Sequence, residues 1–260
     1  MIYNSINSNS IWKGFKNFIV FNKVKEDEAV TSFYLKPSDG IKLPQFIAGQ
    51  FITIRIKNED NTFTKPRQYT LSMNSNEEFY RISIKREEKG FLSKKLCDEI
   101  KVGDTLQITA PLGSFILKDS ERPLILIGAG IGVTPMLTMA FDAVSSDRKI
   151  HFIYSIPNSK NHSFKEEISK LQLHNRNDNF KSYVFYTRPK ETDILGRDFN
   201  IKGRISKEWM IENLPQDGDF YFCGSVPFMK AVYHNLISMG IEEEYINFEM
   251  FESGTDITKE

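Results

Sequence analysis

The chain contains little cysteine: Cys97 and Cys223 are the only two among its 260 residues. Because they are so few and lie far apart in the sequence, a scaffold held together by disulfides is excluded. Two thiolates also cannot ligate an iron–sulfur cluster of the usual four-cysteine type. We therefore expect no such cluster, and no metal site, in this chain.

Net charge is also absent, since 34 Lys and Arg residues balance 34 Asp and Glu residues. Without an overall field, nothing draws the chain to nucleic acid or to an anionic membrane, and a charged partner must meet a local patch. Hydrophobic residues make up 40% of the sequence, which is enough to fill the cores of one large or two medium domains.

Targeting and membrane segments are missing as well. Residues 1–14 are rich in Asn and Ser and have no apolar stretch of signal-peptide length, so we expect a flexible tail and a cytoplasmic protein. The uncharged run 123–141 is long enough to cross a bilayer. Three glycines and Pro135 interrupt it, and no second span is present to satisfy the broken hydrogen bonds, so we predict no transmembrane segment.

Within this run, "LILIGAGIGVTPM" (residues 124–136) predicts a buried strand, a glycine-rich turn and a helix that begins at Thr134. Glycines let the backbone approach a phosphate, and a helix N-terminus favours an anion. The dinucleotide fingerprint G-x-G-x-x-G would need glycine where Val133 stands. The stretch by itself leaves open both a cofactor loop and a turn without a ligand.

The first part of the chain, from about Phe18 to Leu117, alternates apolar and polar residues, as in "RISIK" (residues 81–85). Turn sequences "PSDG", "MNSNEE" and "KVGD" separate the alternating stretches, and one helical piece, "LSKKLCDEI", interrupts them. This pattern predicts short antiparallel strands in a barrel or sandwich.

After Arg122 the pattern changes to compact apolar strands, "LILIG", "IHFIYS", "SYVFYT", "DFYFCG" and "INFEMF". Helical segments separate these strands, and their apolar faces comprise Met136, Leu137, Ala140, Ala143 and Val144, then Phe164, Ile168 and Leu171, and then Phe228, Ala231, Val232 and Leu236. Alternating strands and helices predict a parallel α/β sheet. We place the boundary in "KDSERP", which divides the chain into a tail (1–14), a β domain (15–119) and an α/β domain (120–260).

Ligands of open parallel sheets bind beyond the carboxyl ends of the strands. Four segments fall there: "GAGIGVTP", "YSIPNS", "YTRPKE" and "CGSVPF". We expect these four turns to line one crevice.

Four motifs in order resemble a known family: "RQYTLS" (67–72), "GAGIGVTPM" (128–136), "CGSVPFMK" (223–230) and "FEMF" (248–251). Together they are similar to the ferredoxin-NADP reductase superfamily, in particular to the reductase part of flavohaemoglobins and to bacterial flavodoxin/ferredoxin reductases. The resemblance implies an N-terminal FAD-binding β-barrel followed by an α/β domain that binds NAD(P).

By this resemblance, Arg67 contacts the flavin pyrophosphate, Tyr69 stacks on or beside the isoalloxazine ring, and the Thr70 hydroxyl can hydrogen-bond flavin N5. Gln68 belongs to the same FAD-binding motif, in which Thr70 replaces the usual Ser. Without the family resemblance, the alternative is that Arg67 is simply a surface charge and Tyr69 an aromatic residue of a strand.

A second FAD segment, "IKREEKGFLSKKL", is implied by the same likeness. Gly90 and Ser93 open a short helix whose N-terminus faces the flavin phosphates, and Lys85 adds positive charge. The alternative is a strand–helix connection with solvated charges. "APLGSF" matches the segment that closes the flavin domain.

For the nucleotide, the resemblance implies that Gly128, Gly130 and Gly132 let NAD(P) lie close, with Thr134 near the nicotinamide end. Cys223, Gly224 and Met229 line the nicotinamide side. No acid follows the second parallel strand, whereas Ser155, Lys160 and Arg188 can receive a 2'-phosphate, which favours NADPH over NADH as the donor.

Near the C-terminus, Glu249 and Phe251 match the family's acidic and aromatic residues. Phe251 is implied to cover the flavin as a displaceable lid, and Glu249 to share a polar network with Thr70 and Cys223, the three predicted catalytic residues. The alternative is a hydrophobic terminal strand.

The implied reaction is hydride transfer from NAD(P)H to FAD, after which electrons leave singly for a separate acceptor protein such as a ferredoxin, a flavodoxin or an oxygenase component. Two other hypotheses stay open. One is a flavin-independent NAD(P) dehydrogenase of a small molecule, and the other is a non-catalytic module that holds flavin in an electron-transfer complex.

Overall fold

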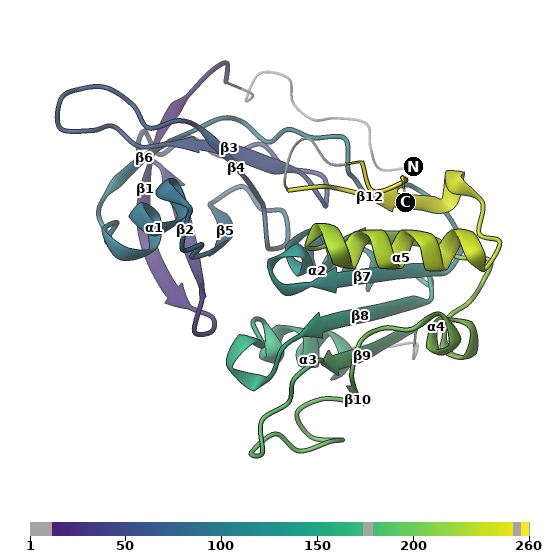
Figure 1. The fold of residues 1–260 in the computed structure, drawn as a ribbon. Helices are drawn as coiled ribbons and strands as arrows, with labels where there is room; N and C mark the ends of the chain where they lie inside the picture. Colours follow the sequence, from purple (N-terminus) through teal and green to yellow (C-terminus); the bar gives the residue numbers. More distant parts are fainter. Residues whose placement is uncertain (1–11, 174–178, 252–255, 260) are drawn as a thin grey trace. The chain divides into compact units, whose positions relative to one another are not determined.

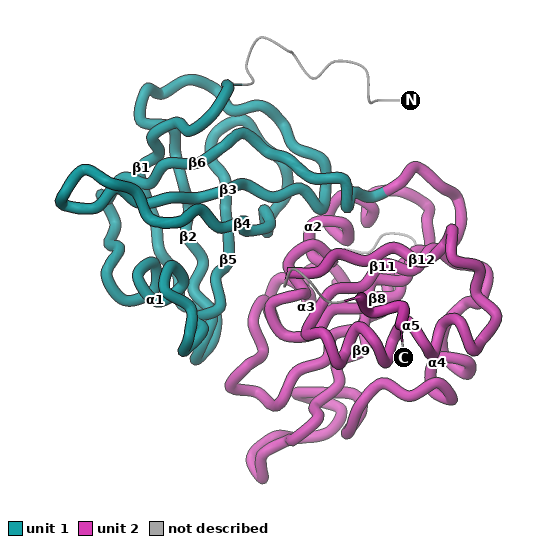
Figure 2. Tube along the Cα trace, turned by 45° about the horizontal axis from the view of Figure 1, so that its top comes forward, with its two compact units in different colours: residues 1–117 teal, residues 118–260 magenta. Residues whose placement is uncertain are grey.

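A computed structural model describes residues 12–173, 179–251 and 256–259. The chain divides into two compact units, residues 1–117 and 118–260, coloured separately in Figure 2. Of the predicted flexible tail, residues 1–14, the first eleven lie outside the described residues.

Unit 1 is built from six antiparallel strands in the order β4-β3-β6-β1-β2-β5. An antiparallel bridge between Leu71 and Ile82 joins the β4 edge to the β5 edge, so the sheet closes on itself, and the predicted β-barrel is confirmed. The elements are β1 (Lys16–Lys25), β2 (Val30–Pro37), β3 (Phe51–Arg55), β4 (Arg67–Thr70), β5 (Tyr80–Lys85), α1 (Phe91–Asp98) and β6 (Thr105–Ile108).

Strand β5 departs from the predicted alternation. Ile82 and Ile84 are buried as expected, but Arg81 and Ser83 are buried as well. The Ser83 hydroxyl bonds the hydroxyls of Ser32 and Ser72 at 2.7 and 2.8 Å, and the Arg81 guanidinium donates to the Ser72 carbonyl. Periodicity alone does not distinguish a solvated polar residue from a buried one whose hydrogen bonds are satisfied.

Unit 2 is a six-stranded sheet in the order β10-β9-β8-β7-β11-β12, and every neighbouring pair is parallel (Figure 1). The predicted parallel α/β domain is therefore confirmed. Its elements are β7 (Leu124–Ala129), η2 (Gly130–Gly132), α2 (Val133–Ala143), β8 (Ile150–Ile156), η3 (Ser159–Asn161), α3 (Lys165–Leu173), β9 (Phe180–Tyr186), β10 (Ile201–Lys202), α4 (Lys207–Asn213), β11 (Asp219–Cys223), α5 (Val226–Ser238), η4 (Glu243–Tyr245) and β12 (Ile246–Phe248).

Four details of unit 2 differ from the prediction. Phe164 precedes α3 with a positive φ of 59°, and Ala231 of α5 is exposed. Strand β12 ends at Phe248, so the rest of "FEMF" lies outside the sheet. Helix α4 was not predicted, although the Ser206 hydroxyl, which accepts from the Trp209 N–H, is a standard N-cap signal.

The uncharged run 123–141 divides into β7, a 3₁₀ turn and α2. In the part of the chain that the structure describes, no helix combines the length and the apolar composition that crossing a membrane requires.

Where the chain enters unit 2, a buried ion pair fixes it to the sheet. The Arg148 guanidinium bonds Asp219 Oδ2 at 2.5 Å and the Arg122 carbonyl at 2.6 Å. Burial lowers the pKa of Arg148, and the charge of Asp219 opposes this. A buried charge is stable only while it is paired, so this contact holds the segment before β7 against the start of β11.

We expect Arg148→Ala to reduce the free energy of unfolding by about 3 to 5 kcal/mol, because Asp219 loses a buried partner. Urea unfolding followed by tryptophan fluorescence measures this change. Arg86→Ala is the control: its ion pairs with Glu88 and Asp98 are exposed, and the loss should stay below about 1 kcal/mol. Equal losses in the two variants would contradict a structural role for the Arg148 pair.

Candidate functional site

The parallel register of unit 2 brings the predicted turns to one edge of the sheet. Gly128 of β7 lies opposite Cys223 of β11 on one side and opposite Tyr154 of β8 on the other. Ser155 lies between Ala129 and Phe185. The turns after β7, β8, β9 and β11 therefore all leave from the carboxyl edge, where a ligand of a parallel sheet binds.

The glycines of this edge mostly serve close packing between turns. A Cβ on Gly132 would overlap the backbone carbonyl of Cys223, and one on Gly128 would lie 2.8 Å from Val133 Cα. On Gly224 it would lie 2.6 Å from the Phe228 ring. The turns after β7 and β11 thus interlock through positions that have no room for a side chain.

Gly130 differs from the other glycines of the turn. Its φ is +53°, and no atom lies within 4 Å of where its Cβ would stand. Thr134, in contrast, is buried, and its hydroxyl donates to the Ile131 carbonyl at 3.0 Å. The first turn of α2 contains no acidic residue, so the positive end of its helix dipole suits an anion.

Cys223 and Glu249 form a polar pair in an apolar setting. Burial, and then the nearby charge of Glu249, raise the pKa of the Cys223 thiol well above its usual value. Burial alone raises the pKa of Glu249 to about 7, and its Oε2 atom is buried with no hydrogen-bond partner among the described residues. The thiol is therefore neutral, and the carboxyl exchanges its proton near neutral pH.

The two phenylalanines of "FEMF" differ. Phe248 stacks on Phe222 with ring centroids 5.4 Å apart and packs, partly buried, against the core. Phe251 is 46% exposed. Beyond it, Ile257 is buried in the same core cluster, and the Lys230 ammonium donates to the Lys259 carbonyl at 2.9 Å.

The remaining nucleotide candidates lie in different settings. Met229 is a residue of α5 and is buried in the core. Ser155 is buried at the end of β8, whereas Arg188 is exposed, with its N–H bonded to the Pro157 carbonyl at 2.9 Å. Asp193, which the sequence did not single out, places its carboxylate against the Ser159 N–H at 3.4 Å. Only the fold brings that acid, from the loop after β9, to the end of β8.

In unit 1, three of the FAD candidates lie on the edge strand β4. Arg67 and Gln68 are exposed, and the Arg67 guanidinium donates to the Pro66 carbonyl at 2.9 Å. Thr70 is buried opposite Phe51. Among the described residues Arg67 has no ion-pair partner, so its charge is available to a phosphate.

Tyr69 is half-buried against the barrel core, near Cys97 of α1. Burial is the main reason that the pKa of its hydroxyl is raised, so the phenol stays neutral. The structure therefore brings β4 and α1, the two predicted flavin-binding segments, close together within unit 1.

The turn at the start of helix α1 is closely packed. A Cβ on Gly90 would overlap the Ser93 hydroxyl, which itself bonds the Gly90 carbonyl and the Glu87 N–H at 3.3 Å each. Ser93 therefore shapes the turn rather than presenting a free hydroxyl. Lys85 forms an exposed ion pair with Glu87 at 2.6 Å.

Lys23, which no sequence motif singles out, anchors the other end of α1. Its ammonium donates to the carbonyls of Cys97 at 2.7 Å and Ile100 at 2.8 Å. A cation at the C-terminus of a helix stabilises it and complements its dipole. Lys23 thereby fixes α1, whose opposite end is the predicted phosphate site.

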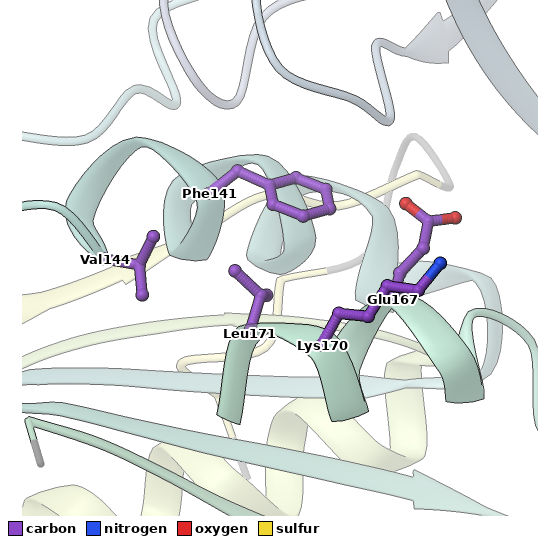
Figure 3. A pocket seen from close by; sticks show the side chains of 5 residues that line it. All are labelled: Phe141, Val144, Glu167, Lys170 and Leu171. Atoms are coloured by element: carbon purple, nitrogen blue, oxygen red, sulfur yellow. The ribbon is translucent and has the colours of Figure 1, made fainter. Parts of the chain in front are cut away.

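A cavity of about 250 Å³ lies on the α2–α3 surface, lined by Phe141, Val144, Glu167, Lys170 and Leu171 (Figure 3). Phe141 and Val144 belong to the end of α2, which leads away from the carboxyl edge, so this cavity is separate from the candidate site. Within the described ranges, no group of three or more His, Cys, Asp or Glu side chains is arranged to hold a metal.

Two models of known protein families match the chain, one within each of its two units. The family model of the oxidoreductase FAD-binding domain matches residues 18–116, and that of the oxidoreductase NAD-binding domain matches residues 126–234. A flavohemoprotein of Bacillus thuringiensis subsp. konkukian is 41% identical over 249 residues, which cover 92% of this chain and 61% of that protein. The chain thus spans about three fifths of the length of that relative.

Two solved structures are similar. The flavohem-like FAD/NAD-binding domain of nitric oxide dioxygenase from Vibrio cholerae O1 biovar El Tor has a TM-score of 0.81 and 33% identity, covering 90% of this chain and 98% of that one. A flavohemoglobin from Malassezia yamatoensis with bound FAD and heme has a TM-score of 0.81 and 26% identity, covering 94% of this chain and 61% of that one.

The chain belongs to the ferredoxin-NADP reductase superfamily. It is an oxidoreductase with an FAD-binding barrel and an NAD-binding α/β domain. The residues present fit both cofactors: Arg67 has no competing acid, the first turns of α1 and α2 lack acidic side chains, and Gly130 has an open face.

We expect Gly132→Ala to destabilise unit 2 by about 1 to 3 kcal/mol, because its Cβ would meet the Cys223 backbone, which cannot rotate away. Thermal unfolding followed by circular dichroism measures the loss. Gly130→Asn is the control, since asparagine tolerates a positive φ and the space is open, so its melting temperature should stay close to that of the wild type. A wild-type melting temperature for Gly132→Ala would refute the interlock.

The stability of unit 2 should depend on the protonation of Glu249. Its pKa rises from about 4.5 unfolded to about 7 folded, so the folded state holds the proton more tightly, and stability falls as pH rises through this window. Relative to Glu249→Gln, the wild type should lose about 1 to 3 kcal/mol between pH 4.5 and pH 7.5. Urea unfolding at several pH values measures this loss, and the exposed Glu212→Gln variant should run parallel to the wild type.

Proposed function

We propose that the protein is an FAD-dependent NAD(P)H oxidoreductase that passes electrons singly to an acceptor outside these 260 residues. The observation that supports this most is the pair of interlocked turns at the carboxyl edge of the α/β unit, in a chain whose other unit matches an FAD-binding domain. When bound, the flavin supplies the step between a two-electron donor and a one-electron acceptor.

In this proposal unit 1 holds the flavin through charge and a ring. Arg67 offers a fork of donors to the pyrophosphate, and the first turn of α1, held in place by Lys23, adds N–H groups. Tyr69 offers its ring to the isoalloxazine, because its phenol is neutral and half-buried. Thr70 offers a hydroxyl from a buried position on the same strand.

Unit 2 holds the nicotinamide nucleotide. Gly130 and the first turn of α2 receive the phosphates, and Cys223 and Gly224 bound the nicotinamide end. Glu249 keeps a proton that it can exchange near pH 7, beside a thiol that stays neutral. Met229 supports this edge from the core rather than facing the ligand.

The acceptor is proposed to be a protein with a one-electron centre. The relatives named flavohemoprotein and flavohemoglobin favour haem, while ferredoxin, flavodoxin and an oxygenase component remain the other candidates. The 260 residues contain too few cysteines for an iron–sulfur cluster of the four-cysteine type, so the acceptor centre lies elsewhere. Anaerobic reoxidation of the reduced protein by a globin, a ferredoxin and a flavodoxin, measured by stopped-flow absorbance, ranks them.

The visible absorption spectrum of the purified protein, before and after anaerobic NADH or NADPH, tests the proposal. Bound flavin that is rapidly bleached is the expected result. Absence of flavin after reconstitution would indicate a flavin-independent dehydrogenase, and flavin that neither donor bleaches would indicate a non-catalytic module.

Arg67→Ala should weaken FAD binding by about 10- to 100-fold, because a charge-assisted phosphate contact contributes about 1.5 to 3 kcal/mol. Titration of the apoprotein with FAD, followed by quenching of flavin fluorescence, measures the dissociation constant. Lys101→Ala removes an exposed charge from the turn before β6 and serves as the control. If both variants bind FAD as the wild type does, Arg67 has no role in the site.

A further inference from the structure

The ends of β8 and β9 continue as a pair of loops that are bonded to each other. The Thr187 N–H donates to the Ile156 carbonyl and the Arg188 N–H to the Pro157 carbonyl, both at 2.9 Å. Next on the β8 side comes the short η3 turn, and on the β9 side the loop that carries Asp193. In a parallel dinucleotide fold, the end of the second strand faces the adenosine ribose.

Asp193 places a carboxylate next to the η3 turn that follows β8. Its Oδ2 accepts the Lys190 N–H at 2.8 Å and the Ser159 N–H at 3.4 Å. Burial raises the pKa of Asp193, but the hydrogen bonds from Ser159 and Lys190 outweigh it, so the pKa lies below its usual value and the group is charged.

The N–H donors of η3 are therefore already in use. Ser159 donates to Asp193, and the Lys160 N–H donates to Asn158 Oδ1 at 3.1 Å. A phosphate bound here must displace the carboxylate from Ser159 and remain beside it. A ribose hydroxyl, in contrast, can donate to the carboxylate without breaking either bond.

Asp198, the other aspartate of this loop, differs from Asp193 in having ion-pair partners. Asp198 forms ion pairs with Lys165 at 2.9 Å and Arg197 at 2.6 Å, so its charge is compensated. Asp193 has no ion-pair partner in the described part of the chain. Its negative charge therefore acts on whatever binds at the end of β8.

We propose that Asp193 determines donor specificity: its carboxylate accepts the 2'-hydroxyl of NADH and repels the 2'-phosphate of NADPH. A repulsive charge against the wrong ligand is an effective source of specificity. The inference rests on the proposed function of this edge as the nucleotide site. It reverses the preference for NADPH expected from Ser155, Lys160 and Arg188, because the fold adds an acid, Asp193, to the end of β8.

Calorimetric titration of the oxidised, FAD-loaded protein with NAD⁺ and with NADP⁺ tests the proposal. We expect the wild type to bind NAD⁺ at least about tenfold more tightly, and Asp193→Asn to reduce this ratio by at least about tenfold. Asn keeps an oxygen for the Ser159 and Lys190 N–H groups, so the loop is retained. Asp193→Ser is a second uncharged variant, and it should shift the ratio in the same direction.

Glu191→Gln is the matched control, because it removes an exposed negative charge two residues away in the same loop. Its NAD⁺ to NADP⁺ ratio should stay within about twofold of the wild type. Equal affinity of the wild type for both nucleotides, or equal shifts for Glu191→Gln and Asp193→Asn, would overturn the role of Asp193. If neither nucleotide binds and neither donor bleaches the flavin, the proposed function fails together with this inference.

Discussion

The close contact between Gly132 and the backbone of Cys223 is the constraint on which the carboxyl edge of unit 2 depends. It exists because β7 and β11 are parallel and in register, with Gly128 opposite Cys223, so that their two turns leave the sheet side by side. Side chains would force these turns apart. The absence of side chains at these glycines therefore allows the edge to form. Gly130 differs from them, because open space surrounds the position of its missing Cβ.

Charge acts locally in a chain that is neutral overall. Glu249 is buried without a partner for Oε2 and holds its proton up to about neutral pH, as its pKa of about 7 indicates. Asp193 receives two backbone N–H groups, and its pKa is held low. Two carboxyls of one unit are therefore in opposite protonation states near pH 6, which equal totals of acidic and basic residues do not reveal.

Much of the fold was predictable from the sequence because it depends on periodicity. Alternation identified the barrel strands, and continuous apolar runs identified β7, β8, β9 and β11. The features that the sequence did not predict depend on contacts between distant segments. Arg81 can be buried because it donates hydrogen bonds to Ser72, Lys23 donates to carbonyls at the end of α1, and Asp193 accepts the Ser159 N–H. The motifs predict where a site lies, but the pattern alone does not show that the hydroxyls of Ser93 and Thr134 donate to neighbouring carbonyls.

The central claim, that the carboxyl edge of the parallel sheet binds the nucleotide, is tested most directly by hydrogen–deuterium exchange of the FAD-loaded protein with and without NAD⁺. Residues 128–134 and 223–229 should become protected together, because their turns are interlocked and share one ligand. Protection confined to the α2–α3 cavity, or protection of one turn without the other, would contradict the claim.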